Sequence, residues 1–289
     1  TGATLSTNLG GGNVTIQSTR GATGTAGDVN VNDVVSWKAN RLTLNAQNNI
    51  NINANLNGTG TAKLALEYGQ GTVAAGNTST YNLNNSAQVN LPAGQNFRTK
   101  QGSDGLVKSF TVITSLGAVG SSTGTDLQGM SGNLSGYYAL GKNIDASATS
   151  AWNRGAGFVP VGNYGNGFSG ILDGLGHTIS NFTINRPNEE YVGLFGFTAG
   201  PSVIRNLGMV GGSVNGGIRV GGLAGANGGS TISNSYNTGS VSGGIIVGGL
   251  AGGNYGAVNN SYATGNVSGS IFVGGLFGAT AGAIRNSYA

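Results

Sequence analysis

The chain has 289 residues, of which 57 are glycine and 36 are asparagine, and only 8% of its residues are charged. Glycine and asparagine are both poor helix formers, so long helices are not expected and turns must be frequent. A hydrophobic fraction of 38% supplies enough apolar surface for a folded core, which argues against disorder. This composition excludes an ordinary helical or α/β enzyme.

The charge pattern excludes several partners. The net charge of +4 comes from cations scattered between Arg20 and Arg285 without a run, whereas a nucleic-acid binder needs a clustered basic face. No apolar stretch approaches the roughly 20 residues of a membrane span. We therefore expect no nucleic acid and no membrane span. Residues 1–20 lack the pattern of a signal peptide, and the chain ends at Ala289, inside a repeat. We therefore interpret the chain as a fragment of a longer protein.

The N-terminal part of the chain contains short stretches in which apolar and polar residues alternate, which is the period of a β-strand. These stretches are residues 14–16, 29–31, 42–44, 50–52, 64–66 and 89–91. When every second strand is compared, the step from Val29 to Ile50 nearly equals the step from Leu42 to Leu64. This step is typical of one turn of a parallel β-helix with two faces per turn. We expect residues 1–108 to form β-helix coils.

Residues 109–190 depart from simple repetition. The Thr-Asp-Leu-Gln sequence at 125–128 has the spacing of a capping box and predicts one or two helical turns. A strand is expected at 137–144, and a strand, a turn and a second strand at 168–179. We interpret this region as an embellished segment of the β-helix.

The last part of the chain, residues 191–289, repeats Val-Gly-Gly-Leu-Ala/Phe-Gly sequences at a nearly constant spacing. The periodic leucines are Leu194, Leu223, Leu250 and Leu276. Asn-Ser-Tyr triplets beginning at Asn234, Asn260 and Asn286 keep the same period, as do Val214, Val241 and Val267. Such short units bury their apolar faces only by stacking, so they predict a solenoid, in which the asparagines form a hydrogen-bonded ladder.

Three stretches resemble known exoproteins. The sequence of residues 248–265 resembles the GLUG repeat, and the stretch from Leu42 to Leu56 resembles the body of filamentous haemagglutinin-type exoproteins of two-partner secretion. The linking sequences at 110–117 and 168–179 are similar to those that join such regions, and together the resemblance covers nearly the whole chain. It implies an all-β, right-handed parallel β-helix with a few short embellishing loops or helical turns.

The resemblance also implies a function. It implies a segment of a large adhesin, secreted or exposed on the bacterial outer cell surface, which takes part in biofilm formation or virulence. The full-length protein would be exported through an outer-membrane transporter, and the partner of this monomeric rod would be a host-cell glycan, a host protein or an exopolysaccharide. A purely structural spacer is the alternative that the residues leave open.

Ligand contacts are expected where the repeat is broken, because inward side chains are fixed by packing. The embellished segment is rich in aromatic and arginine side chains, which give a large contact area at low entropic cost. The candidate ligand-binding residues are Tyr137, Tyr138, Trp152, Arg154 and Tyr164. The alternative is that these aromatic residues fill the core of a larger coil.

Few residues are candidates for catalytic chemistry. Asp126, Asp145 and Asp173 are spaced by about one coil each and could converge as in a β-helical polysaccharide lyase or glycosidase. Each also fits a turn or a cap, so we expect no enzyme. With His177 as the only histidine and no cysteine, we expect no metal and no cofactor.

Overall fold

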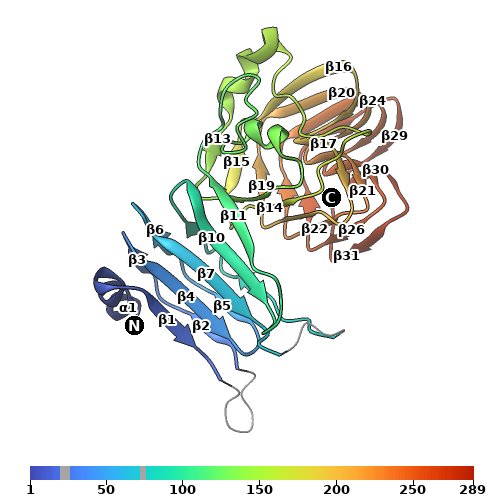
Figure 1. Cartoon of the computed structure of the whole chain (residues 1–289). Helices are drawn as coiled ribbons and strands as arrows, with labels where there is room; N and C mark the ends of the chain where they lie inside the picture. Colours follow the sequence, from blue (N-terminus) through green and yellow to red (C-terminus); the bar gives the residue numbers. More distant parts are fainter. Residues whose placement is uncertain (20–26, 72–75) are drawn as a thin grey trace. The chain divides into compact units, whose positions relative to one another are not determined.

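The structure, a computed structural model, describes residues 1–19, 27–71 and 76–289 (Figure 1). The chain divides into two compact units. Unit 1 comprises residues 1–112 and 139–142, and unit 2 comprises residues 113–138 and 143–289. Within each unit, short strands from successive coils pair in parallel, so the fold is all-β and β-helical, as predicted. The threefold division at 108/109 and 190/191 stays a prediction.

Unit 1 winds three strands into each coil, and equivalent strands of successive coils form three sheets. The first sheet contains β1 (Val14–Gln17), β4 (Arg41–Ala46), β7 (Lys63–Tyr68) and β10 (Gly94–Gln101), with β11 (Lys108–Ile113) antiparallel to β10. The second contains β2 (Val29–Val31), β5 (Ile50–Ile52) and β8 (Tyr81–Leu83). The third contains β3 (Val35–Trp37), β6 (Leu56–Gly58) and β9 (Val89–Asn90). β12 (Tyr137–Leu140) contributes residues to both units.

The register of unit 1 matches the period predicted from sequence. Val29 pairs with Ile50, and Leu42 pairs with Leu64, which are the same steps that the alternating pattern indicated. The expectation of two faces per turn was wrong, because each coil has a third face. A strand of that face such as β3 is very short and offers just two inward side chains, Val35 and Trp37, too few to reveal a period-2 pattern.

Hydrogen-bonded asparagine ladders run along the outside of unit 1. The Asn51 side chain donates to Oδ1 of Asn30 at 2.9 Å and accepts from Nδ2 of Asn82 at 3.0 Å. Asn53 links Asn32 and Asn84 in the same way. Stacked coils bring identical side chains to the same position, so each amide satisfies its neighbour. The frequent asparagines are thus part of the stacking.

An α-helix that the composition did not predict, α1 (Gly2–Gly11), begins unit 1 and packs on β3. The first coil satisfies groups at both ends of this helix. Gly2 N–H donates to the Asp33 carboxylate at 3.0 Å, and Asn40 Nδ2 donates to the carbonyl of Leu9 at 2.7 Å. Leu9 is fully buried. Tertiary contacts therefore outweigh the low helix propensity of this segment.

Unit 2 winds four strands into each coil, which gives four sheets. The first contains β14 (Ile171–Asp173), β18 (Val203–Arg205), β22 (Thr231–Ser233), β26 (Ala257–Asn259) and β31 (Ala283–Arg285). The second contains β13 (Ile144–Asp145), β15 (Thr178–Ser180), β19 (Gly208–Val210), β23 (Tyr236–Asn237) and β27 (Tyr262–Ala263). The third contains β16 (Thr183–Val192), β20 (Ser213–Gly221), β24 (Ser240–Gly248), β28 (Val267–Ser268) and β29 (Ile271–Gly274). The fourth contains β17 (Phe195–Ala199), β21 (Ala224–Gly228), β25 (Ala251–Asn254) and β30 (Phe277–Thr280).

The three periodic columns of the sequence coincide with the register of unit 2. Val214 pairs with Val241, which pairs with Val267. The columns of periodic leucines and of tyrosines also stack coil on coil. The predicted asparagine ladder is present, since Asn234 donates to Asn206 at 3.2 Å. One sequence repeat therefore corresponds to one coil of four strands.

The segment before these coils contains two 3-10 helices, η1 (Gln128–Gly132) and η2 (Ser147–Gly155). The predicted helical turn is thus found, but the predicted capping box is wrong. The capping acceptor is Asp126, whose Oδ1 accepts from Gly129 N–H at 2.7 Å. Gln128 instead exchanges two hydrogen bonds with the backbone of Val159. No helix in the described part of the chain is long and apolar enough to cross a bilayer.

Candidate ligand-binding surface

The structure distributes the five predicted site residues over different environments. Tyr138 is 2% exposed, and its hydroxyl donates to the carbonyl of Asn133 at 2.8 Å. Burial raises the pKa of Tyr138 above its ordinary value of 10.0. Tyr138 is therefore a core residue, in line with the alternative that these aromatic residues fill the core of a larger coil. The neighbouring Tyr137 is 37% exposed.

Trp152 and Arg154 lie in η2, where the backbone departs from helical geometry. The Trp152 ring is half-buried and stacks on Phe158, with 6.4 Å between the ring centroids and 15° between the planes. Arg154 is exposed and has a φ of 60°. Tyr164, by contrast, is 68% exposed and lies in a cluster of aromatic side chains. Of the five predicted residues, Tyr164 is the one that combines high exposure with packing against other aromatic rings.

Three aromatic rings make up the centre of that surface. Tyr164 stacks on Tyr191, with centroids 5.3 Å apart and planes 22° apart. Phe197 meets both rings edge-on, with centroids 5.4 Å from Tyr164 and 5.9 Å from Tyr191. Cζ of Arg219 lies 5.1 Å from the centroid of the Tyr191 ring, a cation–π contact. The Tyr255 hydroxyl also acts electrostatically on Tyr191, and we call these four residues, together with Tyr255, the aromatic cluster.

A tight turn holds Tyr164 at its tip. Asn163 and Asn166 exchange two backbone hydrogen bonds, at 3.0 and 3.1 Å. The Asn163 side chain accepts from the backbone N–H groups of Gly165 and Asn166, an Asx-type turn. The exposed tyrosine therefore projects from a rigid loop and loses little conformational freedom on contact with a ligand.

The coil corners place Tyr191 and Arg219 side by side. Val192 pairs with Val220, so the residues just before them occupy equivalent positions in successive coils. Both have positive φ values, 59° for Tyr191 and 57° for Arg219, and so does Ile246 in the next coil, at 59°. A bulky residue in this region is uncommon, and such strain persists only where surrounding structure imposes it. The corner thus turns a series of large side chains outward.

Small residues of the fourth sheet lie beneath the aromatic cluster. Phe197 pairs with Ala226, and a Cβ on Gly228 would collide with the Phe197 ring. Tyr255 is 50% exposed, and its Cε2 lies 3.1 Å from the position that a Cβ on Gly253 would take. The Phe197 and Tyr255 rings therefore pack directly against glycine and alanine residues of the fourth sheet.

Two charged side chains of opposite sign, Arg219 and Glu190, act on the Tyr191 hydroxyl of the aromatic cluster. Burial raises the pKa of the Tyr191 hydroxyl above 10.0, and the Arg219 charge opposes this rise. The hydroxyl therefore stays protonated at neutral pH and can donate or accept a hydrogen bond. Within the described residues, Arg219 forms no salt bridge, so its guanidinium donors can reach a ligand.

The three aspartates considered for catalysis are held by separate groups. Asp126 accepts from Ser121 at 2.7 Å and from Thr123 at 2.8 Å. Asp173 is fully buried and forms a salt bridge with Arg205 at 2.7 Å. Within the described ranges, no three His, Cys, Asp or Glu side chains come together as a metal site.

Asp145 has an environment opposite to that of a general acid. The side-chain hydrogen bond from Asn181 lowers its pKa, as do the bonds from Ser147. A glycosidase acid needs a raised pKa. His177 is 1% exposed, with Nδ1 3.1 Å from Oδ1 of Asn143. The three aspartates and His177 thus hydrogen-bond to neighbouring groups within unit 2.

Sequence reasoning missed Phe197, Arg219 and Tyr255 as members of the aromatic cluster. They belong to three different coils, and only stacking brings them together. One signal was present in the sequence: Tyr191 and Arg219 both directly precede the Val-Gly of a repeat. Comparing that position across the repeats would have found the pair.

Comparisons with known proteins agree with the repeat architecture. The family model described as the GLUG motif matches residues 216–242, which run from β20 into β24. The chain is similar to halomucin of Haloquadratum walsbyi, with 46% identity over 110 residues, covering 36% of this chain and 1% of that protein.

A second relative is described as a putative Gly-rich membrane protein of Evansella cellulosilytica. It is 38% identical over 75 residues, which cover 26% of this chain and 9% of that protein. The chain thus spans only a small fraction of either relative. No solved structure matches it. The chain is a β-helical repeat protein that carries a GLUG motif.

Proposed function

We propose that the chain is a segment of a secreted or surface-exposed adhesin that binds glycans through the aromatic cluster. The observation that carries the proposal is the packing of Tyr164, Tyr191 and Phe197, in which Tyr164 remains 68% exposed. The exposed Tyr164 ring on its preformed turn, packed beside the half-buried rings of Tyr191 and Phe197, offers a flat apolar face of the kind on which a pyranose ring stacks. Arg219 adds donors for the sugar oxygens at the edge of that face.

The repeat architecture and the relatives support a surface location. Stacked coils make a rigid solenoid whose binding residues lie outward and in loops. One relative is named halomucin and the other a membrane protein. Export by two-partner secretion, through an outer-membrane transporter, is part of the proposal and is supported by the resemblance of residues 42–56 to such exoproteins.

The proposal includes no catalytic step. Asp173 cannot reach a polysaccharide, because it is fully buried under its ion pair with Arg205. Asp145 is held in its ionised form by hydrogen bonds. A host protein as the ligand is the competing outcome, since aromatic and arginine side chains also dominate protein interfaces.

Glycan-array binding of the whole chain tests the proposal. Tyr164→Ala should weaken binding to the selected glycans by about 5- to 150-fold, because stacking on one aromatic face is worth roughly 1–3 kcal/mol. Tyr288→Ala is the matched control: Tyr288 is 62% exposed but stacks on Tyr262, outside the aromatic cluster. Binding that survives in a folded Tyr164→Ala variant, or is lost equally in Tyr288→Ala, contradicts the proposal.

A further inference from the structure

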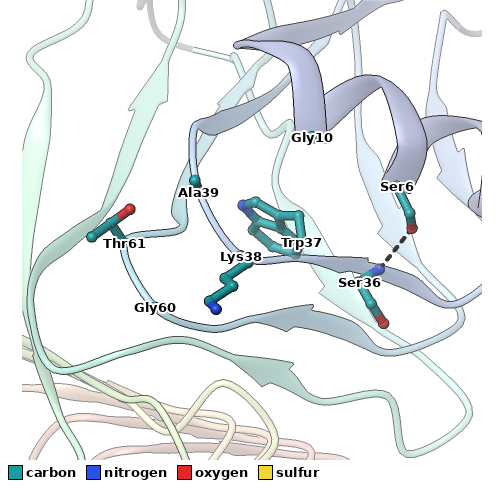
Figure 2. Close-up of a pocket in the computed structure, with 8 residues that line it drawn as sticks. All are labelled: Ser6, Gly10, Ser36, Trp37, Lys38, Ala39, Gly60 and Thr61. Carbon is teal, nitrogen blue, oxygen red and sulfur yellow. Dashed lines mark hydrogen bonds between the residues drawn. The ribbon is translucent and has the colours of Figure 1, made fainter.

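The hollow between α1 and the turns that follow β3 and β6 does not gather its polar groups toward one ligand (Figure 2). Trp37 lies on the buried face of β3, whereas Ser36 lies on the exposed face. A second hollow of unit 1, with a volume of about 160 Å³, is different, because several cations meet there. It lies on the outer face of the first sheet, over β4, β7, β10 and β11.

Strand alternation turns cationic side chains outward over this second hollow. Leu42, Leu64 and Phe97 are at most 3% exposed and point into the core, so the residue next to each of them in its strand points outward. The outward residues that line the hollow are Arg41, Lys63, Arg98 and, on the antiparallel strand, Ser109. We call these four residues the basic patch. Three cations that lie far apart in the sequence therefore share one face.

Two cations of the basic patch stand side by side without a counter-ion. Arg41 of β4 pairs in register with Lys63 of β7, and neighbouring strands lie only about 4.8 Å apart. Like charges directly opposite each other destabilise a sheet. Within the described ranges, neither Arg41 nor Lys63 takes part in a salt bridge. The pair therefore favours an anion supplied from outside the chain.

The carboxylate of Glu67, on the same sheet, is already occupied. It accepts from Arg98 at 3.2 Å and from the side-chain amide of Asn45 at 3.1 Å. Glu67 thus neutralises Arg98, which leaves the charges of Arg41 and Lys63 uncompensated. Lys63 is exposed and Arg41 is half-buried, so both side chains can contact a ligand at the surface.

The size and the other polar groups of the hollow define the ligand. A volume of about 160 Å³ is less than the roughly 300–1,000 Å³ of a typical small-molecule site, so the hollow admits a charged group and not a whole sugar ring. The exposed Ser109 lies beside Arg98 in the register of β10 and β11. Gln95 also lines the hollow, and its amide donates to Thr111 at 2.7 Å. Hydroxyl and amide groups beside two cations suit a ligand that carries both carboxylates and hydroxyl groups.

We propose that the basic patch binds an acidic polysaccharide with a carboxylate on each sugar, a uronate polymer. The planar guanidinium of Arg41 pairs with one carboxylate through two parallel hydrogen bonds, and the ammonium of Lys63 attracts the next as a point charge. The step between coils is roughly 4.8 Å, so cations in successive coils match closely repeated charges better than a single small anion.

Other polyanions fit the basic patch less well. Phe97, the aromatic residue that lines the hollow, is buried and offers no face on which a nucleic-acid base could stack. An acidic peptide lacks the hydroxyl groups that Ser109 and Gln95 would contact. The basic patch is independent of the aromatic cluster, because it uses other residues in the other unit.

Calorimetry of the whole chain with polygalacturonate tests this inference. Binding should be saturable and should weaken as salt rises, because exposed charges are screened. Neutral dextran should bind at least about tenfold more weakly, since it lacks the charge-assisted contacts. Poly-L-glutamate and single-stranded DNA should each bind at least about threefold more weakly, for lack of sugar hydroxyls and of a stacking face respectively. Equal binding of any of the three, or no saturable binding of polygalacturonate, overturns the inference.

Substitutions in the basic patch locate the binding. Arg41→Gln should reduce the polygalacturonate affinity at least about tenfold, and Arg41→Lys about threefold, because lysine keeps the charge and loses the paired hydrogen bonds. Lys63→Gln, at an exposed position, should reduce it about fivefold and tests the patch even if Arg41→Gln fails to fold. An unaltered affinity in folded variants of either residue overturns the inference.

Two further variants serve as controls. Lys142→Gln removes one positive charge at an exposed position outside the basic patch and should leave the polygalacturonate affinity unchanged. A loss equal to that of Lys63→Gln would mean that net charge alone attracts the polymer, which overturns the inference. Tyr164→Ala should also keep the affinity, and a loss there would assign the binding to the aromatic cluster instead.

Discussion

The two units stack their coils in different ways. Unit 1 has three strands per coil, and side-chain amides such as Asn30, Asn51 and Asn82 hold successive coils together. Unit 2 has four strands per coil and glycine at corners where the backbone of one coil touches the next. A Cβ on Gly221 would collide with the carbonyl of Ala224 and with Cα of Ala251. One β-helical architecture therefore rests on side-chain hydrogen bonds in one unit and on close backbone approach in the other.

The comparison can be tested unit by unit, because each unit has one tryptophan. Trp37 lies in unit 1 and Trp152 in unit 2. Urea unfolding followed by fluorescence in the Trp152→Phe background reports unit 1, and the Trp37→Phe background reports unit 2. The two transitions give the free energies of unfolding of unit 1 and unit 2.

The largest effect is expected at the glycine corner of unit 2. Gly221→Ala should destabilise unit 2 by about 4 kcal/mol, because the new Cβ meets main-chain atoms that cannot move aside. Gly11→Ala in unit 1 is the control, since a Cβ there would meet nothing within 4 Å. It should be neutral or stabilising by a few tenths of a kcal/mol, as alanine favours α1. If Gly221→Ala lowers the free energy of unfolding of unit 2 by only a few tenths of a kcal/mol, close backbone approach at this corner does not require glycine.

A smaller effect is expected from the ion pairs. Asp173→Ala should cost unit 2 about 3 kcal/mol, because it leaves Arg205, whose side chain is 19% exposed, without its buried partner. Glu67→Ala in unit 1 removes the partner of Arg98, in a pair whose side chains are 21% and 35% exposed. That change should cost about 1 kcal/mol or less. Equal losses in the two urea titrations would contradict this ranking.

Asparagine has a different role in each unit, and glycine substitution separates the two. Asn51 of unit 1 lies in a strand and holds two ladder bonds, so Asn51→Gly should cost about 1–2 kcal/mol. Asn234 of unit 2 has a φ of 48°, a conformation that glycine adopts freely. Asn234→Gly should therefore cost less than about 1 kcal/mol, because the loss of its ladder hydrogen bond is offset by relief of the strain of a positive φ. The reverse order would show that the ladders do not stabilise unit 1.

The smallest effect is a loss of stability in alkali. Burial raises the pKa of Tyr262, in the stacked tyrosine column of unit 2, above 10.0. Above pH 10 the unfolded chain releases this proton while the folded unit keeps it, so the folded state binds more protons and its stability falls as pH rises. Tyr262→Phe should reduce the slope of stability against pH above pH 10. A variant with an unchanged slope would show that this hydroxyl does not contribute.

The sequence predicted the strands and their register well where apolar residues recur strictly. Leu42 and Leu64, or Val214 and Val241, share a column because each coil repeats the inward pattern of the one before. The α1 helix could not be predicted, since its stability comes from contacts with the first coil.

The candidate site was only partly predictable for a similar reason. Tyr164 was named because it breaks the repeat, and it is part of the aromatic cluster. Phe197 and Arg219 lie in later coils and approach it only after stacking. Tyr138 looked equivalent to Tyr164 in composition, but its strand turns it into the core.

NMR of tyrosine side chains is the sharpest test of glycan binding by the aromatic cluster. The measurement is a titration of the tyrosine-labelled chain with an oligosaccharide selected on the glycan array. We expect shift changes at Tyr164, Tyr191 and Tyr255, with none at the stacked tyrosines Tyr236 and Tyr262, whose ring centroids lie 4.8 Å apart. Shift changes confined to the stacked tyrosines, or the absence of any change on addition of a bound oligosaccharide, would contradict it.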